Sequence, residues 1–288
     1  MTTLAPATGA LRPVRRRRRI QLGSLALVPF ALLMLVPLYL LVVNSLKSQQ
    51  DIVGSPFGAH HITLDYLRSA ATSGDYNVVS AYGVTGLLVV LVCAGMVLFG
   101  GPVAYLIARS PARRYQILKL CFLSAIFVPP GILLVPIVYV LRNLGLYGSL
   151  PGLVLVDLAN SFPFAVFLFS AYIRSIPVSL DEAATIDGCS TLGTFWRVIF
   201  PLMKPAVATA VVLTALWTWN DFINPSILLG PTSSTYTVTT GIYTAIGQYL
   251  TNYTVVYPNI LLTVAPVLVL FLVAQRYIVS GLMEGVGK

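Results

Sequence analysis

Six long stretches of this 288-residue sequence carry almost no charge, and they limit what the chain can fold into. Asp, Glu, Lys and Arg together make up only 9% of the residues, whereas 57% are hydrophobic. Soluble domains carry about 25% charged residues, so this composition cannot cover a surface that faces water. A helix of ~20 apolar residues crosses the hydrocarbon layer of a bilayer. We therefore predict an all-α integral membrane protein with six transmembrane helices, over residues 22–45, 79–107, 120–141, 150–173, 206–229 and 255–278.

The positive charges are distributed unevenly between the two sides that six spans would create. Fifteen of the eighteen Lys and Arg residues precede the first apolar stretch, lie at or beyond the end of the sixth, or lie between the second and third or the fourth and fifth. The remaining three are Lys47, Arg68 and Arg142. Because loops rich in Lys and Arg stay on the cytoplasmic side, both termini are predicted to be cytoplasmic.

Residues 1–21 form an arginine-rich head that contains the five consecutive arginines Arg15–Arg19. We expect this head to be disordered. We interpret its charge as a topology and lipid-surface signal in preference to an arm that binds nucleic acid. A secretory signal peptide would have a shorter apolar run and a small-residue cleavage site. The first apolar stretch has neither feature, so we expect it to remain in the protein as a helix.

The cysteines and histidines are assigned no function. Cys93 and Cys121 lie in apolar stretches and Cys189 lies in a polar loop, without CxxC spacing or an even count. Neither a disulfide framework nor a metal site is therefore predicted. His60 and His61 are adjacent in a polar segment and are interpreted as a solvated pair.

Pro129, Pro130 and Gly131 interrupt the third apolar stretch about halfway along. Lipid cannot satisfy the backbone groups that such a break frees, so the break needs protein or a polar cavity around it. Two interpretations remain open at this point: a kink that serves helix packing, or a break beside a translocation path.

Two carboxylates fall inside predicted spans, Asp157 in the fourth and Asp221 in the fifth. A carboxylate at membrane depth is costly, so each is expected to face a polar cavity or a partner group. Around Asp221, the segment from Trp217 to Phe222 combines hydrogen-bonding groups for sugar hydroxyls with indoles that can stack on a sugar ring. Alternatively, the Trp residues only pack or mark the membrane interface. The candidate substrate-path residues are Trp217, Trp219, Asn220, Asp221, Pro129 and Pro130.

The polar segment between the fourth and fifth spans has the pattern of two short helices. Ser179, followed three residues later by Glu182, predicts a capping box at the start of the first helix. Gly188 can end that helix in a left-handed conformation, and Ser190 or Thr191 can cap the second.

The acidic side chains of this helix pair are Asp181, Glu182 and Asp187. An amphipathic pair could rest on the lipid surface, but acidic groups would be repelled by anionic lipids. The charges therefore favour a docking element for another protein.

The same segment carries a motif at fixed spacing: Glu182-Ala183-Ala184, three residues, Gly188, nine residues, and Val198-Ile199-Phe200-Pro201. It resembles the EAA loop of binding-protein-dependent ABC transporter permeases, which reads EAA, three residues, G, nine residues, I, one residue, LP. Val198 and Phe200 are conservative departures from that pattern. Flanking segments such as Pro129-Pro130 and Trp219-Asn220-Asp221-Phe222 look like those of the carbohydrate, MalG-like branch.

This resemblance implies a type I ABC importer permease fold over residues 22–288, with residues 174–205 as a cytoplasmic coupling loop. It also implies a second permease subunit, two cytoplasmic ATPase subunits and an extracytoplasmic solute-binding protein, in a bacterial plasma membrane. Glu182 would pair with an arginine of the ATPase, and the two alanines would let the helix seat. The coupling residues that the resemblance implies are Glu182, Ala183, Ala184, Asp187, Gly188 and Pro201.

Together these features predict a translocation subunit that moves an oligosaccharide, disaccharide or sugar derivative by alternating access. The sequence has no GxxxxGK[ST] phosphate-binding loop, so the chain is not expected to be an enzyme or to bind a cofactor. ATP and Mg would be used by the partner ATPase. An ion-coupled secondary transporter or channel is the alternative, but two isolated aspartates in six helices support it weakly. A membrane-embedded enzyme would need a cluster of histidines or carboxylates at membrane depth.

Overall fold

Helices make up the regular structure of the chain in the computed structural model, which describes residues 22–72, 78–230, 235–248 and 251–286. Within these ranges no strand is present, as the all-α prediction requires. The chain divides into two units, Met1–Leu40 and Leu41–Lys288. The arginine-rich head predicted at residues 1–21 lies outside the described residues.

The described part of the first unit is a single apolar helix. This helix, α1 (Leu22–Asn44), contains Pro29 and Pro37 and runs on into the second unit. Its bounds agree with the first predicted stretch, residues 22–45.

Among the described residues of the second unit, three helices are long and apolar enough to cross a membrane. The first consists of α4 (Val78–Gly95), the π-helical turn η1 (Met96–Gly100) and α5 (Gly101–Arg109), which together form one 32-residue helix. The others are α8 (Leu150–Ser175) and α15 (Tyr253–Val286), whose described apolar part is Tyr253–Val273. They correspond to the second, fourth and sixth predicted stretches.

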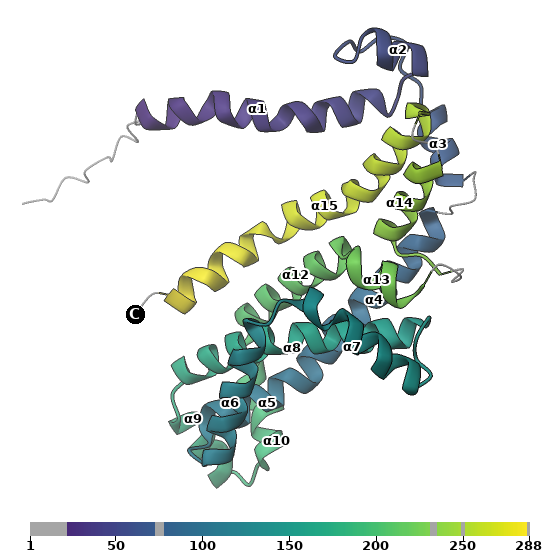
Figure 1. Ribbon diagram of the computed structural model, residues 1–288. Coiled ribbons are helices and arrows are strands. Elements are labelled where there is room, and N and C mark those ends of the chain that lie inside the picture. The colour runs from purple at the N-terminus through teal and green to yellow at the C-terminus, as the bar shows by residue number, and fades with distance from the viewer. Residues whose placement is uncertain (1–21, 73–77, 231–234, 249–250, 287–288) are drawn as a thin grey trace, which may run out of the picture. The chain divides into compact units, whose positions relative to one another are not determined.

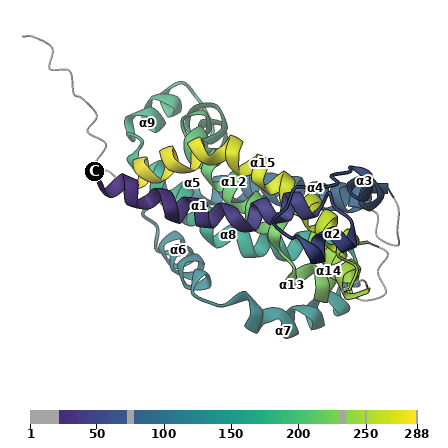
Figure 2. The same cartoon turned by 90° about the horizontal axis from the view of Figure 1, so that it is seen from above.

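The third predicted stretch is two helices and not one. Helix α6 (Arg113–Ile126) and helix α7 (Pro130–Asn143) meet at an angle of 108°. Pro129 is the extended residue before α7, because the residue that precedes a proline is pushed out of the helical region. The break was therefore predicted at the right place. It is a sharp turn between two separate helices and not a kink within one helix. Figure 2 shows α6 and α7 next to α8, with a sharp change of direction between them.

The fifth predicted stretch, residues 206–229, is also divided. Helix α12 (Lys204–Asn220) ends before Asp221, and a short helix, α13 (Ile223–Leu228), follows. Asp221 has extended backbone and accepts hydrogen bonds on Oδ1 from the amides of Ile223 and Asn224, at 3.0 and 3.3 Å. The prediction that Asp221 lies within a continuous span is therefore wrong, since its side chain starts the next helix.

One further helix and one loop lie next to this region. The sequence did not predict α14 (Val238–Gln248), which precedes α15. The link from α7 to α8 packs on α13, because the amide of Gly148 donates to the carbonyl of Leu228 at 2.9 Å and the Tyr147 hydroxyl donates to Ile227 at 3.2 Å.

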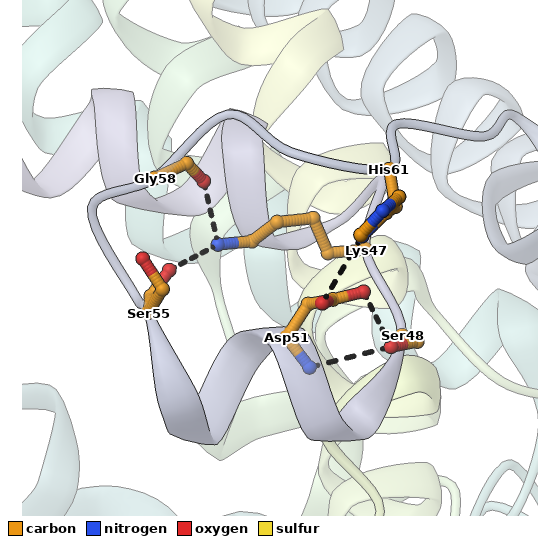
Figure 3. A network of polar contacts seen from close by, with 6 residues as sticks. All are labelled: Lys47, Ser48, Asp51, Ser55, Gly58 and His61. Atoms are coloured by element: carbon orange, nitrogen blue, oxygen red, sulfur yellow. Dashed lines mark hydrogen bonds and ion pairs between the residues drawn. The ribbon is translucent and has the colours of Figure 1, made fainter.

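A buried lysine organises the loop between α1 and α4. Lys47 is 1% exposed, and its Nζ donates to the carbonyl oxygens of Ser55 at 2.8 Å and Gly58 at 2.9 Å (Figure 3). It also donates to the carbonyl oxygen of Pro56 at 3.3 Å. Three carbonyl dipoles thus take the place of water around the ammonium group, which a buried charge requires. The loop also contains the short helices α2 (Gln49–Gly54) and α3 (Asp65–Thr72).

The same loop holds a carboxylate in the first turn of α2, next to the N-cap residue Ser48. Asp51 accepts a hydrogen bond from the hydroxyl of Ser48 at 2.7 Å and lies 3.4 Å from the ring of His61 (Figure 3). The Ser48 hydrogen bond holds the pKa of Asp51 below its ordinary value of 3.8, and the neighbouring His61 acts in the same direction.

The largest buried cluster joins η1 and α5 to α8, α12 and the turn that precedes α12. Its centre includes Phe169, Phe195, Ile199 and Met203, each fully buried. Gly101 lies against Phe195, where a Cβ on Gly101 would be 2.8 Å from the ring. The missing side chain therefore permits this close approach of helices. In Figure 1 this end of the second unit carries α9 and α10, and α2 and α3 lie at the opposite end.

Candidate functional site

The segment between α8 and α12 forms the two short helices that the sequence predicts. They are α9 (Ser179–Ile186) and a second helix built from α10 (Thr191–Thr194), the π-turn η2 (Phe195–Ile199) and α11 (Phe200–Leu202). Gly188 separates them with a φ of +80°, a left-handed conformation that favours glycine. Ser190 caps the second helix, because its Oγ accepts the amide of Gly193 at 3.2 Å.

The capping box predicted for α9 is absent. Val178 is the N-cap residue and makes no side-chain capping bond, while Ser179 is already the first helical residue. The Glu182 carboxylate therefore makes no capping hydrogen bond at the start of α9, and its side chain is exposed. An exposed glutamate is free to contact another protein.

The helix α9 has two distinct faces. Glu182, Ala183 and Asp187 are exposed, and Ile186 is 86% exposed. Ala184 is only 5% exposed and faces the protein's own interior. The two alanines of the EAA motif therefore differ, because only Ala183 lies on the outward surface. A large apolar side chain beside exposed acids is typical of a surface that another protein covers.

Asp181 points inward, unlike its neighbour Glu182. Its Oδ2 lies 2.9 Å from the guanidinium of Arg109, and its Oδ1 accepts a hydrogen bond from the Tyr105 hydroxyl at 2.6 Å. Arg109 also donates to the carbonyl of Ile176 at 2.9 Å. The side chains of Arg109 and Asp181 are each 14% exposed, so water screens this pair far less than a surface pair. The expectation that Asp181 belongs to the docking charges is wrong, because it ties α9 to the end of α5.

A second candidate site is a cavity of about 770 Å³ between α6, α7, α8, α12 and α13. Its volume falls within the roughly 300–1,000 Å³ that small-molecule sites occupy. Polar groups gather on its α8, α12 and α13 side, and apolar residues of α6 and α7 form much of the remainder. The polar lining residues are Asp157, Asn160, Ser161, Thr214, Thr218, Asn220, Asp221 and Asn224.

The two aspartates of the cavity are connected through one asparagine. The side-chain nitrogen of Asn224 donates to Oδ1 of Asp157 at 3.0 Å, and its backbone amide donates to Oδ1 of Asp221 at 3.3 Å. The Thr239 hydroxyl donates to the Asp221 carbonyl at 2.6 Å, which fixes the same turn from α14. Asp221 is thus held mainly as a helix cap. Asp157 is one of the residues that line the cavity, and its Oδ2 is buried without a hydrogen-bond partner among the described residues.

The structure brings together some of the predicted substrate-path residues and not others. Trp217, Asn220, Asp221 and Pro130 line the cavity, and the Trp217 ring makes an edge-on contact with Phe164 at 5.0 Å between centroids. Trp219 and Pro129 are not among the lining residues. Trp219 packs near Tyr82 instead, with ring centroids 6.1 Å apart.

Several residues of both regions were not predicted from the sequence. In the cavity these include Asn160 and Asn224, whose positions depend on how α8 and α13 pack. The loop between α8 and α12 is contacted by Tyr105 and Arg109 of α5, which were predicted only as a residue of a span and a residue that sets topology. Their spacing of four places both on one helix face, which is the only local signal that they act together.

Comparison with known proteins identifies the family. Residues 100–283 match the family described as binding-protein-dependent transport system inner membrane component. The chain is 34% identical over 261 residues to the multiple sugar-binding transport system permease protein MsmG of Streptococcus mutans, covering 89% of this chain and 93% of that protein. It is 28% identical to the diacetylchitobiose uptake system permease protein NgcG of Streptomyces coelicolor, covering 93% and 89%.

Solved structures show the same fold. A chain of a bacterial ABC transporter involved in the import of the acidic polysaccharide alginate superposes with a TM-score of 0.78 at 24% identity, covering 89% of this chain and 95% of that one. A chain of the alginate transporter in complex with its pentasaccharide-bound periplasmic protein gives a TM-score of 0.66 at 17% identity, covering 88% and 93%. This chain is therefore a multi-pass membrane protein that belongs to the family of binding-protein-dependent transport system inner membrane components.

Proposed function

We propose that this chain is a permease subunit of an ATP-driven ABC importer, which moves a carbohydrate across a bacterial plasma membrane by alternating access. The proposal rests on two features that this chain combines. The helix with the EAA motif faces outward, and a separate polar cavity is lined by an indole. Relatives that import sugars support the choice of substrate class. Family membership favours this importer over an ion-coupled secondary transporter or channel.

The proposed topology has six spans with both termini in the cytoplasm. The uneven distribution of Lys and Arg supports the orientation. In this scheme α1, the α4 to α5 helix, α8, α12 and α15 are five of the spans. The bent pair α6 and α7 takes the place of the remaining one, with its break next to the cavity. Non-helical backbone at membrane depth is tolerated where it lines a cavity, so this location suits the break at Pro129.

Coupling to ATP hydrolysis is proposed to run through α9. Its exposed face would enter a groove of a cytoplasmic ATPase subunit, with Glu182 paired to an arginine there and Ala183 at the contact. The rest of the docking loop would be shaped by Asp187, Gly188 and Pro201. The buried Ala184 would pack α9 against the permease itself. ATP and Mg would be bound by the ATPase, so this chain would be the translocation subunit and not an enzyme. The complete assembly would contain a second permease, two ATPase subunits and an external solute-binding protein.

The motion of α9 would reach the membrane helices by two routes. The covalent links pass it to α8 and α12, while the Arg109 to Asp181 ion pair passes it to α5. The tight contact of Gly101 with Phe195 adds an apolar connection between α5 and the second short helix. Rigid elements packed this closely move as one body, which is how a small displacement at an ATPase can open or close a distant cavity.

Affinity purification of the tagged chain from mild detergent tests the proposal. We expect a second permease and an ATPase to co-purify, and we expect the complex to hydrolyse ATP faster when the solute-binding protein and its sugar are added. A chain that purifies alone even after crosslinking, with no associated ATPase, would contradict the importer.

A further inference from the structure

The charged groups that line the cavity are all of one sign. They are the carboxylates of Asp157 and Asp221, and no Lys or Arg side chain lines the cavity in the part of the chain that the structure describes. The other polar groups of the lining are uncharged amides and hydroxyls. A ligand in this cavity therefore meets negative charge and hydrogen-bonding groups, with no cation to balance a negative charge of its own.

The two carboxylates are not equivalent toward a ligand. Asp221 already accepts two backbone hydrogen bonds on Oδ1, at the start of α13. Asp157 is 6% exposed and uses Oδ1 to accept the side-chain amide of Asn224, whereas its Oδ2 is buried and has no partner among the described residues. A buried carboxylate oxygen without a donor is unfavourable, so a ligand that supplies a donor gains from binding there.

Sugar chemistry determines which ligands can supply that donor. A hydroxyl group donates a hydrogen bond to a carboxylate oxygen. A uronate or a phosphate presents acceptors and a negative charge to the same oxygen, and the two negative charges repel each other.

Building on the proposed function, we propose that this cavity takes sugars without negative charge and rejects uronates and phosphorylated sugars. Asp157 is the residue that determines this specificity, through Oδ2. The structural neighbour from the alginate importer serves an acidic polysaccharide, so similarity of fold alone would not lead to this selectivity.

Tryptophan fluorescence of the assembled permease complex can measure binding directly, without the selectivity of the solute-binding protein. Trp217 lines the cavity and is 53% exposed overall, so a bound sugar should change its emission. The probes are the uncharged maltotriose, raffinose and diacetylchitobiose, and the anionic trigalacturonate and glucose 6-phosphate. The variant Trp217→Phe should abolish the signal, which identifies the cavity as its source.

We expect at least one uncharged probe to bind about tenfold or more tightly than either anionic probe, which corresponds to ~1.4 kcal/mol or more. Asp157→Asn keeps an oxygen for Asn224 but removes the charge and the second acceptor, so this ratio should fall. Asp65→Asn removes an exposed carboxylate outside the cavity and should leave the ratio unchanged. If Asp157→Asn does not fold, Asn160→Asp provides the converse test, because an added carboxylate in the lining should weaken anionic probes further.

Three results separate this inference from the proposed function. Anionic probes that bind as tightly as uncharged ones, or a ratio that Asp157→Asn does not alter, would overturn the inference. A complex that takes up sugar with ATP but shows no Trp217-dependent binding of any probe would also overturn it, and the importer function would stand. A complex that hydrolyses ATP but takes up no sugar would contradict the proposed function itself.

Discussion

The Asp181 carboxylate of α9 lies 2.9 Å from the guanidinium of Arg109 at the end of α5, and both side chains are 14% exposed. The adjacent residue, Glu182, is exposed on the surface of the same helix. Two consecutive acidic residues thus have different surroundings: one joins the short helix to its own chain, and the other remains available to a partner. This division underlies the proposed path from ATPase to membrane helices.

Breaking the Arg109 to Asp181 pair should uncouple transport from ATP hydrolysis. Asp181→Ala leaves the guanidinium without its carboxylate, and removing one partner of a buried pair costs about 3–5 kcal/mol. The double variant Arg109→Ala/Asp181→Ala should cost less than the sum of the single ones, because no unpaired charge is left. The measurement is sugar transported per ATP hydrolysed, together with thermal unfolding of each variant.

Arg113→Ala is the matched control for that experiment, since Arg113 is exposed and lies on the same side of the membrane in the proposed topology. A purely structural pair would lower the unfolding temperature and leave the ratio of transport to hydrolysis unchanged, and that result would remove the pair from the coupling path.

Glu182→Ala should weaken ATPase docking and leave the fold intact. The side chain is exposed, and surface substitutions of this kind change the free energy of unfolding by about 0.5 kcal/mol or less. The amount of ATPase that co-purifies should therefore fall while the melting temperature stays the same. Glu182→Gln separates charge from contact area, and full ATPase recovery with both variants would exclude Glu182 as the anchor.

Gly101→Ala should destabilise the packing between α5 and the second short helix. The new Cβ would lie 2.8 Å from the ring of Phe195, which is fully buried, and overpacking of a core costs about 1–3 kcal/mol. Gly83→Ala is the control, because no atom lies within 4 Å of a Cβ there. It should be neutral or stabilise the helix by up to ~1 kcal/mol. Equal effects of the two substitutions on thermal unfolding would show that the Gly101 contact is not tight.

Lys47→Met should loosen the loop that joins α1 to α4. The substitution keeps an unbranched side chain but leaves the carbonyls of Ser55 and Gly58 without their donor, and hydrogen bonds to a charged group contribute about 1.5–3 kcal/mol. Limited proteolysis should then cut residues 55–58 faster than in the unaltered protein. Arg68→Met, at an exposed position, should leave the cleavage rate unchanged. Protection of the loop in the Lys47 variant would mean that the carbonyl contacts do not hold it.

The sequence was sufficient to predict the helices whose apolar residues run without interruption. The helices α8 and α15 and the 32-residue helix from α4 to α5 were predicted because their composition alone requires a nonpolar environment. Hydropathy was less informative at Asp221. Pro225 follows Asp221 by four residues, and an aspartate placed before a first helical turn that contains a proline is a signal for a new helix. That local signal was outweighed by the long uncharged run around it.

The features of the site that the sequence did not predict all depend on contacts between distant segments. Nothing near Asp181 indicates that its partner is Arg109, and nothing near Asp157 indicates that Asn224 reaches it from another helix. The EAA spacing drew attention to the loop between α8 and α12, but it could not distinguish the buried Ala184 from the exposed Ala183. Which side of a short helix faces inward depends on the chain against which it packs.

Uptake of radiolabelled sugar by proteoliposomes tests the central claim most directly. The vesicles would contain this chain, its co-purified permease and ATPase, with the solute-binding protein outside and ATP inside. We expect accumulation that requires ATP, the binding protein and Glu182. Sugar uptake that proceeds without ATP, or that is driven equally well by an ion gradient, would contradict it.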